Sequence, residues 1–275
     1  MCDTCGCNIT DSNRHLLKPG GKFYRTSEGH EAVTVLKSLL SENDRMAQHN
    51  RQHFDRHNVL AVNLMSSPGS GKTALLESTL DALDKNIRVA VIEGDLETEN
   101  DAERIRKKGI PAIQISTGSA CHLDAHMVHD ALHQLSLDDI DIVFIENVGN
   151  LVCPASFDLG QHLNVTLLSV TEGDDKPSKY PVMFRASDLM LLTKTDLLAV
   201  LDDFDLATAE NNLRQLASTA PVIALSARKQ IGMDNWLKWL LQQQTEQSKL
   251  AQLGQTRKPM IQPDGQQLHA GMQTP

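Results

Sequence analysis

The sequence lacks any long hydrophobic run, any excess of positive charge and any internal repeat. Without a long hydrophobic run, no transmembrane helix is predicted and membrane association is not expected. The net charge of −9 and the pI near 5.6 leave no broad basic surface for phosphate backbones, so nucleic acid is not expected as a principal partner. The N-terminal region also has no apolar leader core, which predicts a cytoplasmic protein.

Cysteine is scarce, and its five copies are unevenly distributed. Cys2, Cys5 and Cys7 crowd the N-terminus, whereas Cys121 and Cys153 lie far along the chain. An odd number of cysteines in a reducing compartment argues against a disulfide framework. The distribution instead indicates metal or redox chemistry.

The clearest local signal is a glycine-rich loop at 66–73, with the sequence Ser-Ser-Pro-Gly-Ser-Gly-Lys-Thr. It follows the apolar run 59–65 and precedes a helix-like segment at 74–83, which is the strand-loop-helix setting of a phosphate-binding P-loop. Lys72 and the Thr73 hydroxyl would meet the β- and γ-phosphates and Mg²⁺. A serine replaces the first glycine of the full pattern, and a simple turn with an incidental lysine is the alternative. The predicted nucleotide contacts are Gly69, Ser70, Gly71, Lys72, Thr73 and Ala74.

A second motif favours guanine as the base. Residues 193–196 read Thr-Lys-Thr-Asp, a near match to the Asn-Lys-x-Asp box of GTPases. Asp196 can accept hydrogen bonds from guanine N1–H and from the exocyclic amine, which adenine cannot supply. Thr193 removes one amide contact that an asparagine would make. The Ser-Ala-Arg sequence at 226–228 falls where GTPases place a second base-contacting loop. The predicted base contacts are Lys194, Asp196, Ser226 and Ala227.

Acidic residues follow two of the predicted strands and are candidates for holding Mg²⁺ and orienting the attacking water. The run 87–93 is followed by Asp95 and Asp101, and the run 140–146 ends in Glu146. A single aspartate at such a position can equally be a helix N-cap. The predicted catalytic residues are Lys72, Asp95, Asp101 and Glu146, and the predicted Mg²⁺ ligands are Thr73, Asp101 and Glu146.

Short β-rich runs alternate with helical stretches from residue 59 onward. This alternation predicts a doubly wound α/β fold with a mostly parallel sheet, here a P-loop GTPase domain. Ligands of such sheets bind beyond the carboxyl ends of the strands. The predicted strands are 59–65, 87–93, 111–115, 140–146, 164–170, 187–193 and 221–225. The predicted divisions are a flexible Cys-rich metal-binding arm at 1–26, a helix packing on the domain at 27–58, the GTPase domain with an internal metal site at 59–245, and a disordered tail at 246–275.

Two cysteine-containing clusters are candidate transition-metal sites. Cys2, Cys5 and Cys7 place three thiols near the terminal amine, a donor set suited to planar Ni²⁺ or tetrahedral Zn²⁺. A redox-active or vestigial cluster is the alternative interpretation, and the sequence does not separate nickel from zinc.

The second cluster combines the adjacent Cys121 and His122 with Cys153. Both segments flank predicted strand ends close to the expected γ-phosphate position. Metal affinity at this cluster is therefore expected to change with the nucleotide state. Taken alone, Cys153 would be interpreted as a small buried apolar residue.

Histidines recur at helical spacing in two further places, and each set could bind a transition metal weakly. Histidines exposed on a helix surface are the favoured interpretation, with His126 the exception because it lies one turn from His122. The two sets are His126, His129 and His133, and His49, His53 and His57.

The sequence resembles the HypB-type nickel-incorporation GTPases of nickel-iron hydrogenase maturation, from about residue 28 to 245 and again in the N-terminal cysteine motif. Beyond the P-loop, three segments carry the resemblance. They are Cys-His-Leu-Asp-Ala-His at 121–126, Glu-Asn-Val-Gly-Asn-Leu-Val-Cys-Pro at 146–154 and Thr-Glu-Gly-Asp-Asp-Lys at 171–176.

The resemblance implies a slow GTPase that uses GTP and Mg²⁺, dimerises when GTP is bound, and holds Ni²⁺ or Zn²⁺ at a subunit-bridging site. It implies that nickel passes to the hydrogenase large-subunit precursor, with a HypA-type metallochaperone and, in some bacteria, SlyD as partners. The implied domain ligands are Cys121, His122 and Cys153, and the implied high-affinity nickel motif is Cys2, Cys5 and Cys7. A urease-type nickel GTPase and a metal-storage or zinc-binding protein are the alternatives.

Overall fold

The computed structural model describes residues 30–95, 99–118, 120–216 and 218–259. The expected metal-binding arm at 1–26 lies outside the described residues. The described chain forms one seven-stranded sheet with the strand order β3-β2-β4-β1-β5-β6-β7, and every pairing is parallel. The strands are β1 (Leu60–Ser66), β2 (Val89–Asp95), β3 (Ala112–Ser116), β4 (Ile142–Glu146), β5 (Leu163–Ser169), β6 (Leu189–Thr193) and β7 (Val222–Ala224).

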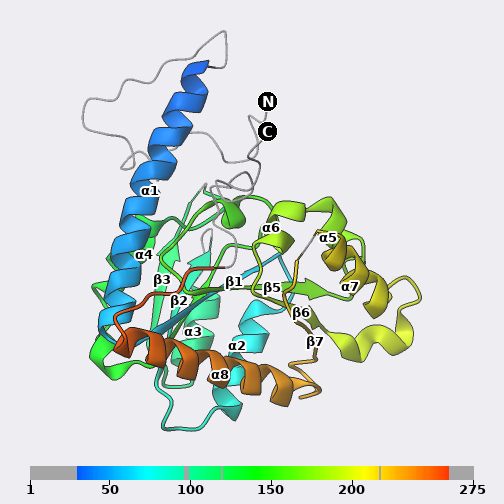
Figure 1. Cartoon of the computed structure of the whole chain (residues 1–275). Helices are drawn as coiled ribbons and strands as arrows, with labels where there is room; N and C mark the ends of the chain where they lie inside the picture. Colours follow the sequence, from blue (N-terminus) through cyan, green and yellow to red (C-terminus); the bar gives the residue numbers. More distant parts are fainter. Residues whose placement is uncertain (1–29, 96–98, 119, 217, 260–275) are drawn as a thin grey trace.

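Helices cover both faces of this sheet, with α2, α3 and α8 on one face and α1, α4, α6 and α7 on the other (Figure 1). The predicted doubly wound parallel fold is therefore confirmed. Each predicted strand run overlaps an observed strand, and the ends of the two differ by at most two residues. The α-helices are α1 (His30–Arg56), α2 (Lys72–Ala82), α3 (Asn100–Arg106), α4 (Ala125–Leu132), α5 (Lys176–Lys179), α6 (Pro181–Arg185), α7 (Leu206–Gln215) and α8 (Met233–Gln252), and the 3-10 helices are η2 (Leu137–Asp139), η3 (Cys153–Ser156) and η4 (Thr195–Val200).

The core is divided in two because successive strand side chains point to opposite faces. Leu64 of β1 belongs to the same buried cluster as Leu75 of α2 and Trp236 of α8. Ala61, on the opposite face of β1, belongs to a cluster with Phe54 of α1. Burial on both faces explains why the strands read as continuous apolar runs rather than as alternating patterns. No described helix is both long enough and apolar enough to span a bilayer.

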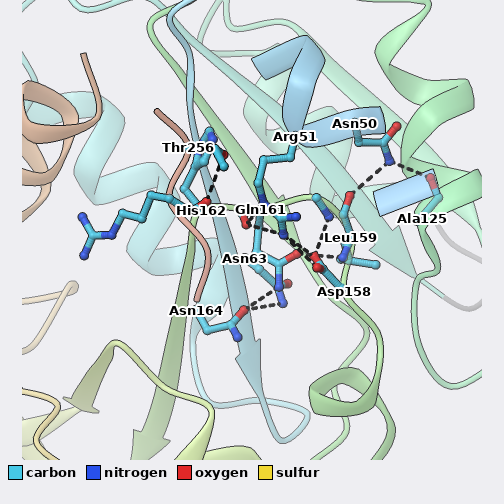
Figure 2. Close-up of polar contacts among 12 residues, drawn as sticks. Asn50, Arg51, Asn63, Ala125, Asp158, Leu159, Gln161, His162, Asn164 and Thr256 are labelled. Atoms are coloured by element: carbon cyan, nitrogen blue, oxygen red, sulfur yellow. Dashed lines mark hydrogen bonds and ion pairs between the residues drawn. The ribbon is translucent and has the colours of Figure 1, made fainter. Parts of the chain in front are cut away.

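Polar anchors hold α1 against the domain (Figure 2). The Arg51 guanidinium donates two hydrogen bonds to the Asp158 carboxylate, at 2.6 and 2.8 Å, and both side chains are buried. The Asn50 amide nitrogen donates to the carbonyl oxygens of Ala125, at 2.7 Å, and Leu159, at 3.1 Å. Because these bonds reach both α4 and the loop before β5, α1 has one fixed position on the sheet.

The sequence predicted a disordered tail from residue 246, and this boundary is too early in the chain. Helix α8 continues to Gln252, and the chain is described to residue 259. Gln247 is fully buried and donates a hydrogen bond to Asp55 of α1 at 2.8 Å, while Arg257 donates to Gln243 at 2.6 Å. The glutamine-rich composition suggested disorder, but glutamine is a good helix former and here bonds to α1. Residues 260–275 lie outside the described residues.

We expect Gly160→Ala to lower the free energy of unfolding by about 1–3 kcal/mol more than Gly109→Ala does. Both glycines have a positive φ, +93° and +78°, so both substitutions carry backbone strain of about 1 kcal/mol. A Cβ at Gly160 would also lie 2.6 Å from the Ala47 carbonyl oxygen of α1, whereas a Cβ at Gly109 meets nothing within 4 Å. Urea denaturation of both variants measures the difference, and equal losses would contradict the close approach of α1.

Candidate functional site: a P-loop beside a carboxylate cluster and a thiol-imidazole cluster

The P-loop connects β1 to the N-terminus of α2. Gly69 and Gly71 have φ values of +75° and +97°, a conformation that glycine adopts without the strain a Cβ would bring. Gly71 is the N-cap of α2 and supplies no side-chain cap, so the first amides of the helix remain available to an anion. Lys72 is buried, and its Nζ donates to Ser66 Oγ at 3.0 Å. The serine that replaces the expected glycine therefore positions the lysine.

Glu172 holds the P-loop by hydrogen bonds, although it is not part of that loop. It was not identified from the sequence as a candidate site residue. Its carboxylate accepts hydrogen bonds from the hydroxyls of Ser67 and Ser70, the latter at 2.6 Å, and from the backbone amide of Ser169 at 3.1 Å. The signal that could have found it was its place in the segment 171–176, which carries the family resemblance. Glu172 joins the end of β5 to the P-loop.

Three carboxylates lie close together in a cavity that the P-loop also lines. Glu93, Asp101 and Glu146 each offer one oxygen, and these oxygens all lie within 4.8 Å of one another. Thr73 Oγ1 donates to Glu146 Oε1 at 2.9 Å, and Asp101 forms an ion pair with Arg104 at 2.7 Å. Carboxylate and hydroxyl oxygens are the ligands that Mg²⁺ prefers.

The two glutamates of this cluster are buried in an unusual way. Glu93 and Glu146 are 2% and 3% exposed, and each has one Oε2 atom without a hydrogen-bond partner. Burial, followed by the neighbouring Glu146 charge, raises the pKa of Glu93 to about 11. Burial also raises the pKa of Glu146, although the Lys72 charge opposes this. A bound divalent cation would replace the proton that this pair otherwise needs, so the residues present fit Mg²⁺.

The sequence predicted Asp101 and Glu146 in this place but missed Glu93. A carboxylate closing the mainly apolar run 87–93, two residues before Asp95, was the available signal. Asp95 does not belong to the carboxylate trio but lines the same cavity. That cavity has a volume of about 400 Å³, and its walls include Lys72, Thr73, Glu93, Asp95, Asp101 and Glu146.

A second cavity of about 340 Å³ lies on the other side of the P-loop. Asp196 Oδ1 accepts a hydrogen bond from Ser226 Oγ at 2.6 Å, so the two predicted base-contacting loops meet. Thr193 Oγ1 donates to the Ser70 carbonyl at 2.7 Å and thereby ties the first of these loops to the P-loop. The predicted nucleotide and base residues in its wall are Ser70, Gly71, Ala74, Lys194, Asp196, Ser226 and Ala227.

The thiol-imidazole cluster consists of Cys121, His122 and Cys153. One ligand atom of each residue lies within 4.8 Å of the other two, and Cys121 Sγ is 3.7 Å from His122 Nδ1. The His122 ring stacks on Phe157 at a centroid separation of 3.9 Å. Burial lowers the pKa of His122 to about 4, which keeps the imidazole neutral and able to bind a metal. Two thiols and an imidazole suit Ni²⁺ or Zn²⁺.

The segment 146–153 joins the two clusters, because it begins at a carboxylate and ends at a thiol. Asn147 Oδ1 accepts from the Leu123 amide at 3.1 Å, next to His122. A Cβ added to Gly149 would lie 2.8 Å from Pro68 Cα, so the segment also lies directly against the P-loop. The N-terminal thiols at Cys2, Cys5 and Cys7 lie outside the described residues.

We expect Glu93→Gln to raise the free energy of unfolding at neutral pH by about 1–3 kcal/mol when no nucleotide or divalent cation is present. The folded-state pKa of about 11 lies above the ordinary value of 4.5. The wild-type protein therefore loses stability as the pH rises between these values, and a neutral amide removes that loss. Urea denaturation between about pH 5 and pH 8 checks this. Glu103→Gln, at an exposed position of α3, is the matched control. If the free energy of unfolding changed with pH equally in Glu93→Gln and Glu103→Gln, the raised pKa of Glu93 would be contradicted.

Comparisons with known proteins agree with this geometry. Residues 60–224 match the CobW/HypB/UreG nucleotide-binding domain family. The chain is 55% identical over 202 residues to the hydrogenase maturation factor HypB of Escherichia coli strain K12, covering 74% of this chain and 69% of that protein. It is 40% identical over 218 residues to the hydrogenase/urease maturation factor HypB of Helicobacter pylori, covering 78% and 89%.

Two crystal structures share the fold. HypB from Helicobacter pylori in complex with nickel has a TM-score of 0.71 and 41% identity, covering 74% of this chain and 96% of that chain. The hydrogenase maturation factor HypB from Archaeoglobus fulgidus has a TM-score of 0.70 and 38% identity, covering 74% and 100%. With more than half of its residues inside the family match, and with this degree of identity to curated relatives, the chain belongs to the CobW/HypB/UreG family and, within it, to the HypB group.

Proposed function

We propose that this chain is a Mg²⁺-dependent GTPase that binds nickel and zinc and uses the GTP cycle and dimerisation to deliver nickel during hydrogenase maturation. The observation that carries the proposal is the segment 146–153, which contributes Glu146 to the carboxylate cluster and Cys153 to the thiol-imidazole cluster. A relative was crystallised in complex with nickel, and the curated relatives are hydrogenase maturation factors.

In the proposed nucleotide site, the P-loop amides and Lys72 bind the β- and γ-phosphates, and Asp196 binds the guanine edge. Thr73, Asp101 and Glu146 hold Mg²⁺, together with Glu93. The ion would neutralise negative charge on the β- and γ-phosphates. Asp95 or Asp101 orients the attacking water, and Lys72 stabilises the charge that builds on the transferred phosphoryl group. The proposed further base contacts are Lys194, Ser226 and Ala227.

In the proposed cargo site, Cys121, His122 and Cys153 bind nickel or zinc as a three-ligand set. A GTP-promoted second copy of the chain would complete the site across a dimer interface. Hydrolysis would then loosen the segment 146–153 and lower the affinity for the metal. The N-terminal Cys2, Cys5 and Cys7 serve as a separate nickel motif. The proposed partners are a HypA-type metallochaperone, SlyD in some bacteria and the hydrogenase large-subunit precursor, in the cytoplasm.

Urease maturation is the second candidate function, because one relative carries the name hydrogenase/urease maturation factor. Both functions use nickel as cargo and differ in the acceptor protein. Restoration of hydrogenase activity or of urease activity in a strain lacking this chain distinguishes them. A storage protein, the remaining alternative, would bind metal without hydrolysing GTP.

We expect Asp196→Asn to weaken GDP binding about 10- to 100-fold, because an amide cannot accept both guanine N–H donors. Xanthosine diphosphate has a carbonyl in place of the exocyclic amine and should bind this variant better than it binds the wild type. Isothermal titration calorimetry with both nucleotides measures the change. Asp202→Asn, at an exposed position nearby, should leave GDP affinity unaltered. Unchanged GDP affinity in Asp196→Asn would place the base elsewhere.

We expect Ni²⁺ affinity at the thiol-imidazole cluster to differ at least about fivefold between the GDP state and the state with a slowly hydrolysed GTP analogue. The Cys121→Ala and Cys153→Ala double variant should lose that nucleotide-sensitive site, keep GDP binding and retain any nucleotide-insensitive N-terminal site. Val152→Ala, at the exposed neighbouring position, is the matched control. Equal Ni²⁺ affinities in the two nucleotide states would contradict the coupling. An unchanged number of bound Ni²⁺ ions in the double variant would show that the site lies elsewhere.

A further inference from the structure

Four histidines from two helices meet at the contact between α1 and α4, away from the thiol-imidazole cluster. The ring centroids of His49 and His53 on α1 are 4.6 Å apart, and His49 lies 5.0 Å from His129 on α4. His133, just past the end of α4, lies 4.5 Å from His129. His129 is therefore the centre of an α1–α4 histidine cluster, which we define as His49, His53, His129 and His133. His49 and His133 are exposed, as the interpretation of these residues as surface histidines expects, whereas His53 and His129 are half-buried. The sequence did not predict that the two sets of histidines meet.

The tautomer of His129 is fixed by Asn50, which also holds α1 in place. The Asn50 amide nitrogen donates to two backbone carbonyl oxygens, as Figure 2 shows, so its Oδ1 atom is left as an acceptor. His129 Nδ1 lies 3.1 Å from that oxygen and must carry the proton. In the neutral ring the Nε2 atom then carries the lone pair. This arrangement, one ring nitrogen held by an amide oxygen and the other left as the acceptor, is the one that metal-binding histidines use.

The Nε2 atom of His129 accepts a hydrogen bond from another imidazole. It lies 3.0 Å from His133 Nε2, and a metal ion would take the place of the proton between them. With metal-nitrogen bonds of about 2.0–2.1 Å, this separation gives an angle of about 90° at a shared ion. An angle of that size belongs to square-planar or octahedral coordination, which Ni²⁺ and Cu²⁺ adopt. His49 is exposed, and its ring centroid lies 5.0 Å from that of His129, so a change of its side-chain rotamer is the movement by which it would become a third ligand.

The charges around the cluster are mostly those of its own imidazoles. Burial, followed by neighbouring positive groups, lowers the pKa of both His53 and His129. The groups that face them, besides the other cluster histidines, are Arg56, His57, His126 and the carboxylate of Asp130. His57 is paired separately with Asp138 at 2.7 Å.

We propose that the α1–α4 histidine cluster binds one late first-row divalent transition metal ion through the Nε2 atoms of His129 and His133, with His49 or His53 as a third ligand. The bound ion would join α1 to α4, the helix that begins just after His122. A second, thiol-free site of lower affinity would then lie on α4, the helix that directly follows the Cys121 and His122 ligands of the candidate cargo site. This inference does not depend on nucleotide binding or on the thiol-imidazole cluster.

The test is a Ni²⁺ titration by calorimetry of the full-length chain without a histidine tag, with all five cysteines replaced by serine. We expect one remaining Ni²⁺ equivalent. His133→Gln in that background should weaken binding at least tenfold, because one ligand is lost while the glutamine amide can still donate to His129 Nε2. His57→Gln, just past the end of α1 and paired with Asp138, is the matched control and should change the affinity less than twofold. Absence of Ni²⁺ binding to the cysteine-free chain, or equal binding by His133→Gln, would overturn the proposal.

Hydrogen-deuterium exchange on the wild-type chain supplies a second readout that does not need the cysteine replacements. Ni²⁺ should slow amide exchange in residues 40–56 of α1 and in α4, and this protection should disappear in His133→Gln. Protection confined to the segments around Cys121 and Cys153 would overturn the proposal. Because the cargo site fails only if those segments are unprotected, failure of one proposal is distinguishable from failure of the other.

Discussion

The parallel pairing of β2 with β4 places Glu93 directly opposite Glu146, and this pair organises the site. Two carboxylates buried in an apolar sheet cannot both carry a charge without a cation or a proton between them. Nearby groups are arranged around that constraint, because Thr73 donates to Glu146 and the Lys72 charge opposes the rise in the pKa of Glu146. The large apolar core on both faces of the sheet stabilises the fold and offsets the free-energy cost of burying these two carboxylates.

The same constraint connects nucleotide chemistry to metal chemistry. The chain leaves β4 at Glu146, touches the P-loop at Gly149 and reaches the thiol of Cys153. Asn147 also bonds to the backbone beside His122. A change in the ligand bound between the carboxylates and the P-loop therefore acts directly on the segment 146–153, which carries the metal ligand Cys153. This is contiguous physical contact, which a mechanism of coupled binding requires.

Polar groups also decide how α1 is attached. Buried Arg51 and Asp158 form an ion pair, while Asn50 bonds to two carbonyl oxygens from different segments. Directional bonds of this kind fix the rotation of the helix about its axis more strictly than apolar contact alone. That rotation brings His49 and His53 onto His129, so the histidine cluster is a consequence of the anchoring.

The strand positions and the P-loop could be predicted because their signals are local. An apolar run, a glycine-rich turn and a following helix together occupy only about thirty consecutive residues, so the pattern is visible in the sequence. Asp101 and Glu146 were predicted for the same reason, since Asp101 follows one predicted strand and Glu146 ends another. Glu93 ends the run 87–93 in the same way, but its role depends on its place opposite Glu146 in the paired strands, which the sequence does not show. The end of α8 was missed because burial of Gln247 depends on α1, far away in the sequence.

By itself, then, the sequence determined the order of strands and helices, the phosphate-binding loop and the types of ligand atom available. Only the tertiary structure decided which of those atoms meet. Parallel register set Glu93 against Glu146, and the return of the chain after β4 brought Cys153 to Cys121 and His122. The anchoring of α1 joined two sets of histidines that are more than seventy residues apart in the chain. Propensity and spacing act over a few residues, whereas the meeting of distant side chains depends on how whole elements pack.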